Sequence, residues 1–189
     1  MLLSYYRELC DVTLPYANRQ KYMHTFDLSA PEMAAGFEDY LSPVKALCEA
    51  AGAIRGFAHM TVDEKVVSAG MSQRRPKPHV DGCFMPMAGS WGHEPGWAHG
   101  CNNIPLAEFK RMPVIVASSV RGCRAWRGIF DAVPASDGDL SHLVLGEGEV
   151  LQENRGYLLS ADCVHESMIQ PEAVRRSFLR IALPVEFRV

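Results

Sequence analysis

The chain has 189 residues, of which 48% are hydrophobic and 22% charged, and its formal net charge is −3. This composition is typical of one globular domain, and the slight negative charge gives no electrostatic argument for a nucleic-acid or membrane partner. No segment approaches the roughly 18 consecutive apolar residues that a membrane span requires. A membrane protein and a long nucleic-acid interface are therefore not expected.

The cysteines predict the compartment. Arg7 and Glu8 interrupt the N-terminal apolar stretch, so we expect no secretory signal peptide. The six cysteines form no Cys-x-x-Cys pair: Cys10, Cys48, Cys83, Cys101, Cys123 and Cys163. Scattered cysteines without a secretion signal are typical of free thiols in a reducing compartment. We therefore expect a cytoplasmic protein.

Residues 1–53 are predicted to be mainly helical. Ser29 can cap a helix that starts at Pro31, and Pro43 should separate it from a second helix at 44–51 that ends at Gly52. Helical spacing of apolar residues supports the first of these helices, at Met33, Phe37, Tyr40 and Leu41.

Residues 54–189 are predicted to be rich in β-strands. Strands are expected at 54–61 and 65–69, around a turn at Asp63 and Glu64. The β-branched segment 113–119 predicts a buried strand. Further strands are expected at 123–130, 140–145, 149–152, 157–165 and 174–185. Several short strands separated by turn residues predict a sandwich or a barrel.

The segment 82–113 is a predicted loop rich in glycine and proline. Loops longer than about 12–15 residues are usually functional in compact domains. We interpret this one as a lid or substrate loop with four candidate substrate contacts: Trp91, His93, Trp97 and His99. One alternative is a surface loop without a functional role, held in place by its own aromatic residues. Another is a zinc site formed by Cys83, His93, His99 and Cys101, although the spacing of these residues is irregular.

A metal site is predicted from His79 and Asp81, which lie two residues apart. On an extended segment, such residues point to the same face. His165, near the end of a predicted strand, can supply a third ligand. Two histidines and one carboxylate leave coordination positions open, which suits non-haem Fe(II), whereas a structural zinc site is closed.

An arginine follows the third candidate ligand. In the segment 174–185, strand alternation places Arg175 and Ser177 on the more apolar face, with Leu179, Ile181 and Leu183. We expect that face to line the interior. A buried arginine needs an anionic partner, and a dicarboxylate ligand could supply one. Glu147 or Glu166 is an alternative partner. A β-bulge would reverse the phase and favour Arg176 or Arg180 instead.

Together these residues resemble the Fe(II)- and 2-oxoglutarate-dependent dioxygenases. That family carries His-x-Asp/Glu, a distal histidine, and an arginine about ten residues later, often as Arg-x-Ser; the matching positions are His79, Asp81, His165, Arg175 and Ser177. The resemblance covers roughly residues 55–185. It implies a single oxygenase domain, 1–189, with a double-stranded β-helix (a cupin-like jelly roll) at 54–189 and supporting helices at 1–53.

The resemblance also implies an activity. Fe(II) would be held by His79, Asp81 and His165, and the far carboxylate of 2-oxoglutarate by Arg175 and Ser177. Oxidative decarboxylation of 2-oxoglutarate would drive hydroxylation or a related oxidation of a small molecule, and the intact Asp81 carboxylate argues against halogenation. Alternatives are the same chemistry on a nucleobase or protein side chain, and a cupin-like metal protein without 2-oxoglutarate, which would not need a buried arginine.

Overall fold

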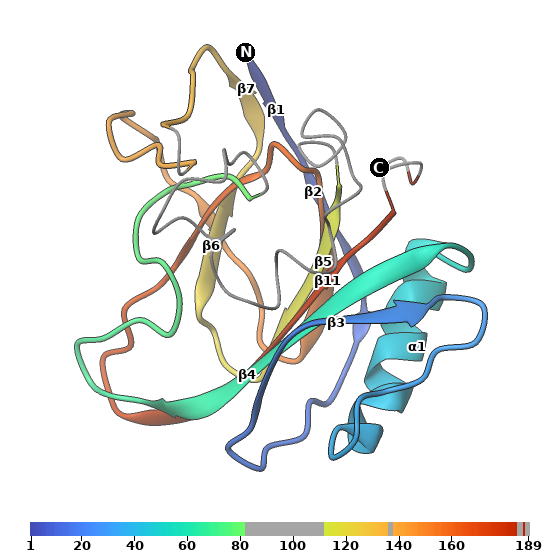
Figure 1. The fold of residues 1–189 in the computed structure, drawn as a ribbon. Helices are drawn as coiled ribbons and strands as arrows, with labels where there is room; N and C mark the ends of the chain where they lie inside the picture. The colour runs from blue at the N-terminus through green and yellow to red at the C-terminus, as the bar shows by residue number, and fades with distance from the viewer. Residues whose placement is uncertain (82–111, 136–137, 185–186, 188–189) are drawn as a thin grey trace.

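The structure, a computed structural model, describes all residues except 82–111, 136–137, 185–186 and 188–189. The prediction of a mainly β protein is confirmed (Figure 1). The four cysteines in the described ranges, Cys10, Cys48, Cys123 and Cys163, are free thiols. In those same ranges, no helix has the length and apolar character needed to cross a membrane.

The largest sheet has six antiparallel strands in the order β2-β9-β5-β11-β4-β3. We call it the main sheet. Its strands are β2 (Tyr6–Asp11), β3 (Gln20–Asp27), β4 (Phe57–Val67), β5 (Val114–Ser118), β9 (Arg155–Leu159) and β11 (Val174–Ala182).

A second, smaller sheet has three antiparallel strands in the order β10-β6-β8. These are β10 (Val164–Ser167), β6 (Cys123–Trp126) and β8 (Glu149–Val150). A two-stranded ribbon pairs β1 (Leu2–Ser4) with β7 (Gly128–Phe130). The helical elements are a 3-10 turn, η1 (Glu38–Tyr40), and the α-helix α1 (Leu41–Ala51).

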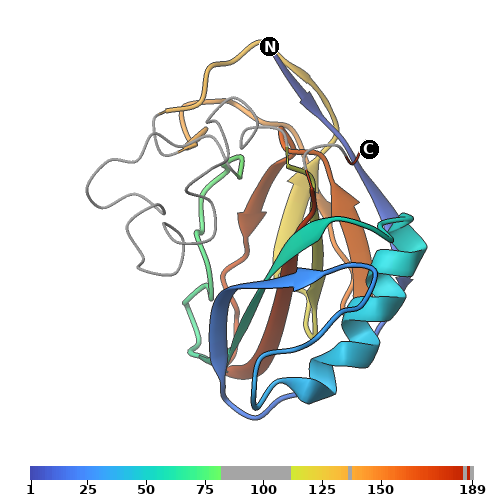
Figure 2. The same ribbon diagram turned by 45° about the vertical axis from the view of Figure 1, so that its right-hand side comes forward.

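Helix α1 covers one face of the main sheet, and the segment that ends at Asp81 lies on the other side (Figure 2). Val44 and Leu47 of the helix belong to a buried cluster with residues of β4, β5, β9 and β11. Gly52 ends the helix in the left-handed conformation, with φ 82°, as predicted. On the other face of the main sheet, Ala125 of β6 shares a buried cluster with Val116 of β5 and Phe178 of β11, so the small sheet covers that face.

The predicted helical character of 1–53 is wrong. β1, β2 and β3 occupy much of this region, and of the two predicted helices only α1 forms. Pro43 does not break it, because a proline in the first helical turn removes an N–H that has no intrahelical partner anyway. Phe37 and Tyr40 are buried in the cluster under α1 although Phe37 precedes any helix. Their spacing reflects packing onto that cluster, not a helix.

Strand boundaries also differ from prediction. β4 runs without a break through Asp63 and Glu64, where a turn was predicted. The segment 140–145 contains no strand, and the predicted strand 157–165 divides into the end of β9 and the start of β10. The predicted strand at 113–119 is confirmed as β5, and 123–130 forms the two strands β6 and β7.

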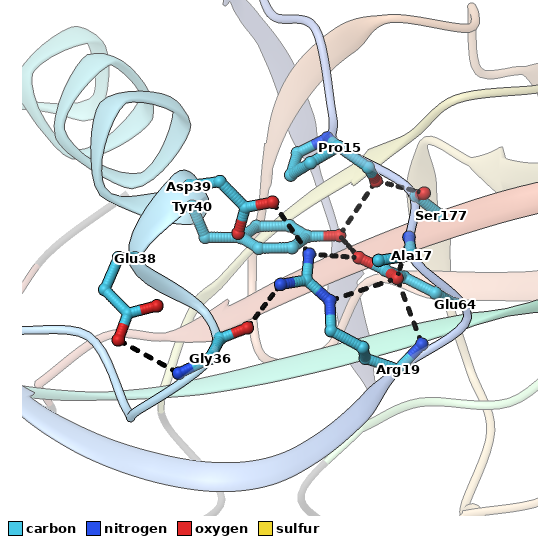
Figure 3. Close-up of polar contacts among 9 residues, drawn as sticks. All are labelled: Pro15, Ala17, Arg19, Gly36, Glu38, Asp39, Tyr40, Glu64 and Ser177. Carbon is cyan, nitrogen blue, oxygen red and sulfur yellow. Dashed lines mark hydrogen bonds and ion pairs between the residues drawn. The ribbon is translucent and has the colours of Figure 1, made fainter.

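A polar network explains how β4 buries Glu64 (Figure 3). The carboxylate accepts hydrogen bonds from the Arg19 side chain at 3.0 Å, from the Tyr40 hydroxyl at 2.9 Å and from the Ala17 backbone at 2.6 Å. Burial alone would raise the pKa of Glu64, but these donors lower it, so the side chain stays ionised. The network ties residues 15–19 and η1 to the helix side of the main sheet.

Gly156 of β9 lies directly against Leu47 of α1. A Cβ atom added there would overlap Cδ2 of Leu47. We therefore expect Gly156→Ala to lower the free energy of unfolding by about 1–3 kcal/mol, because overpacking forces side chains or backbone to shift. Chemical denaturation measures this. Gly146→Ala, whose Cβ would enter open space, is the control; equal midpoints for the two variants would contradict this packing.

Candidate metal centre

The structure brings the three predicted ligands together between the two sheets. The ligand atoms of His79, Asp81 and His165 all lie within 4.8 Å of one another. The backbone contributes to this placement, because the His79 N–H donates to the His165 carbonyl at 2.9 Å and the His165 N–H donates to the His79 carbonyl at 3.0 Å. This antiparallel bridge attaches the His79 segment to β10.

Each imidazole is oriented by a second contact. His79 Nδ1 lies 2.7 Å from the Lys77 carbonyl, and His165 Nδ1 lies 2.9 Å from the Cys163 carbonyl. Because a carbonyl oxygen only accepts, Nδ1 is the donor in both rings, and the neutral form of each ring therefore has its lone pair on Nε2. Carbonyl contacts of this kind commonly orient histidine ligands of metals. His165 Nε2 lies 3.9 Å from Asp81 Oδ2.

The protonation states also suit a metal. Burial, together with the neighbouring His165, lowers the pKa of His79 to about 3, so this ring is neutral at pH 7. Burial would raise the pKa of Asp81, but the charge of Arg180 and its hydrogen bond to the carboxylate lower it below its usual range. Metal binding requires neutral imidazoles and an ionised carboxylate. His79 and Asp81 are in those states before any metal binds.

The group lies in a small pocket whose walls come from both sheets. Cys123 and Ser167 line it from the small sheet, and Phe178 and Arg180 line it from β11. Arg180 Nε donates to Asp81 Oδ2 at 2.9 Å. A larger cavity of about 530 Å³ lies between α1 and the end of β3, but none of the three candidate ligands lines it.

The predicted inward orientation of Arg175 is wrong. Arg175 is exposed, and its guanidinium lies over the Tyr16 ring, 5.8 Å from the centroid. Ser177 is buried, but its hydroxyl donates to the Pro15 carbonyl in the network of Figure 3, and neither residue lines the pocket. The alternation along β11 is as predicted; the more apolar face, with Leu179, packs under α1, and the opposite face points to the pocket.

Among the described residues, Arg176 is the arginine that is completely buried. It donates to Ser118 Oγ at 2.9 Å, to Ser167 Oγ at 3.3 Å and to Cys123 Sγ at 3.4 Å. Among the described residues, no acidic side chain forms an ion pair with it. Ser167 and Cys123 also line the metal pocket, so the guanidinium lies directly behind its wall. Alternation places Arg176 on the same face of β11 as Arg180, but the sequence alone does not show that this face lines the pocket.

The candidate substrate contacts Trp91, His93, Trp97 and His99 lie outside the described residues, as do Cys83 and Cys101 of the alternative zinc cluster. The lid therefore stays a prediction.

Comparison of the chain with protein-family models, with curated proteins and with solved structures gave no match. The functional argument therefore depends on the geometry and chemistry of this site.

Proposed function

We propose that this chain is an Fe(II)- and 2-oxoglutarate-dependent dioxygenase that couples oxidative decarboxylation of 2-oxoglutarate to the hydroxylation, or a related oxidation, of a small molecule. The proposal depends on one observation above all. Two histidines and one carboxylate converge within 4.8 Å in a pocket, and a fully buried arginine without an acidic partner among the described residues lies behind that pocket.

The donor set fits Fe(II). Two imidazole nitrogens and one carboxylate oxygen form the set that non-haem Fe(II) oxygenases use, with positions left open for cosubstrate and O₂. A structural zinc site has four protein ligands, whereas the described residues offer three here. When bound, the iron would bring 2-oxoglutarate and O₂ together and supply the oxidation of the substrate.

The protein's own residues would orient and shield this chemistry. The carbonyls of Lys77 and Cys163 fix the two imidazole rings with Nε2 as the acceptor. Arg180 holds one carboxylate oxygen of Asp81, which limits the rotation of that side chain. Asp81, Arg180 and the two histidines are largely withdrawn from solvent, so competing reactions with water are suppressed.

Arg176 supports 2-oxoglutarate as the cosubstrate. A guanidinium buried with only hydroxyl and thiol partners lacks a compensating negative charge, and a carboxylate would supply it through two parallel hydrogen bonds. We assign the far carboxylate of 2-oxoglutarate to Arg176, with Ser118 and Ser167 beside it, in place of Arg175 and Ser177. A cupin-like protein without this cosubstrate would not need such an arginine.

We also propose that the two sheets form a double-stranded β-helix. The position of the site between them supports this, since His165 comes from the small sheet while Arg176 and Arg180 come from the main sheet. Free thiols at the four described cysteines support a reducing compartment such as the cytoplasm.

Anaerobic titration tests the proposal. The protein should bind Fe(II), and addition of 2-oxoglutarate should then produce a weak metal-to-ligand charge-transfer band in the visible range. After exposure to air, succinate should form slowly even without substrate. Folded protein that binds iron but shows neither the band nor succinate would contradict the cosubstrate assignment. As the control for the band, 2-oxoglutarate is replaced by succinate, because succinate lacks the keto group.

A further inference from the structure

Most charges around the metal pocket are paired among the described residues. Glu166, which lines the pocket, forms an ion pair with Arg124 at 3.0 Å, and Asp81 forms one with Arg180 at 2.9 Å. Arg74, also in the lining, lies 3.6 Å from Asp63. These pairs leave the charge of Arg176 without a negative partner in the described ranges.

Iron and cosubstrate would not cancel this excess. Fe(II) adds two positive charges and 2-oxoglutarate adds two negative ones, so loading the site leaves the positive excess to which Arg176 contributes unchanged. Buried charges are normally paired, because leaving one unpaired in a medium of low dielectric constant is costly. The loaded pocket is therefore suited to one further anionic group.

Arg180 has the donor that such a group would need. Its Nε is engaged by Asp81, but its Nη1 is buried without a hydrogen-bond acceptor among the described residues. An unsatisfied donor on a charged side chain is unfavourable. The guanidinium fork can keep its contact with Asp81 and still donate Nη1 to an oxygen of a carboxylate or phosphate.

We propose that Arg180 is the receptor for an oxyanion on the primary substrate, and that the substrate is a small molecule bearing a carboxylate or phosphate group. This proposal rests on the proposed function, because the charge count assumes bound Fe(II) and 2-oxoglutarate. One guanidinium contacts both Asp81 and the substrate's oxyanion, so the anionic end of the substrate lies close to the metal ligands.

The test uses the protein loaded anaerobically with Fe(II) and 2-oxoglutarate. Acetate and inorganic phosphate are titrated separately at constant ionic strength, with neutral acetamide and chloride as controls. The shift of the charge-transfer band and the thermal unfolding temperature are both followed. We expect a saturable response to acetate or to phosphate and none to acetamide; the anion that binds more tightly identifies the group on the substrate.

Variants of Arg180 test whether this side chain binds the anion. Arg180→Gln should raise the apparent Kd of the responding anion about ten-fold or more, as expected for a charge-assisted hydrogen bond, and Arg180→Lys should retain part of the affinity. Arg175→Gln, at an exposed position of the same strand, should bind the anion as the wild type does. Circular dichroism and the Fe(II) affinity of each variant show whether the site is otherwise intact.

Three results would overturn the proposal: no saturable response to either oxyanion, an equal response in Arg180→Gln and wild type, or weaker 2-oxoglutarate binding in Arg180→Gln with the anion response unchanged. The last would assign Arg180 to the cosubstrate. Failure of the proposed function is distinguishable, because the charge-transfer band would then be missing before any anion is added.

Discussion

Replacing His165 with alanine should abolish stoichiometric Fe(II) binding and leave the fold in place. The substitution removes one of the three ligands. Loss of a group that only orients a ligand lowers metal affinity about 10–100-fold, so loss of a ligand itself should lower the Fe(II) affinity more than about 100-fold. The backbone hydrogen bonds between residues 165 and 79 do not involve the side chain and should persist. Anaerobic equilibrium dialysis with iron quantification measures the affinity.

His142→Ala is the matched control, because His142 is exposed and lies outside the metal group. It should bind iron as the wild type does, whereas His79→Ala should lose binding as His165→Ala does. Far-ultraviolet circular dichroism of each variant tests the fold. Tight one-to-one Fe(II) binding by folded His165→Ala would show that the metal is held elsewhere.

Two of the three metal ligands could be predicted together from sequence because their relative geometry is local. Residues two apart on an extended chain share a face, so His79 and Asp81 had to point the same way. The third ligand, His165, was identified by its place at the end of a predicted strand. The bridge between His79 and His165 that completes the site is a long-range backbone contact, and no local pattern contains it.

The choice among the arginines of β11 could not be made in the same way. Alternation correctly places Arg175 and Arg176 on opposite faces of β11. It does not show which face packs against the helix and which one faces the metal pocket. Both faces of the main sheet are covered, and the more apolar one, with Leu179 and Ile181, packs under α1. The rule that the more apolar face lines the site therefore selected the wrong side.

Buried charge and irregular backbone explain why β3 and the full length of β4 were not predicted from the sequence. Asp63 and Glu64 have the composition of a turn, yet β4 continues through them because Arg19, Tyr40 and neighbouring backbone groups satisfy Glu64. In β3, Met23 has a φ of 52°, and the pairing with β4 shifts register between Lys21 and His24. That irregularity interrupts the period of two by which a strand is recognised.

Arg176→Gln should weaken 2-oxoglutarate binding about 100-fold while sparing Fe(II), because two charge-assisted hydrogen bonds to the far carboxylate would be lost. Titration of the charge-transfer band measures the cosubstrate, and dialysis measures the iron. Arg175→Gln is the matched control on the same strand, and it should leave both affinities unchanged. If Arg175→Gln weakened 2-oxoglutarate binding instead, the assignment of the two faces of β11 would be contradicted.

A buried arginine also contributes to packing, so a second readout separates recognition from stability. 2-Oxopentanoate resembles 2-oxoglutarate but carries a methyl group in place of the far carboxylate. Wild-type protein should bind 2-oxoglutarate far more tightly than 2-oxopentanoate, and Arg176→Gln should lose most of this preference, whereas Arg176→Lys should keep part of it. A purely structural role would lower the stability of Arg176→Gln and leave the ratio of the two affinities unchanged, because Arg176 would then not contact the end of the ligand at which the two compounds differ.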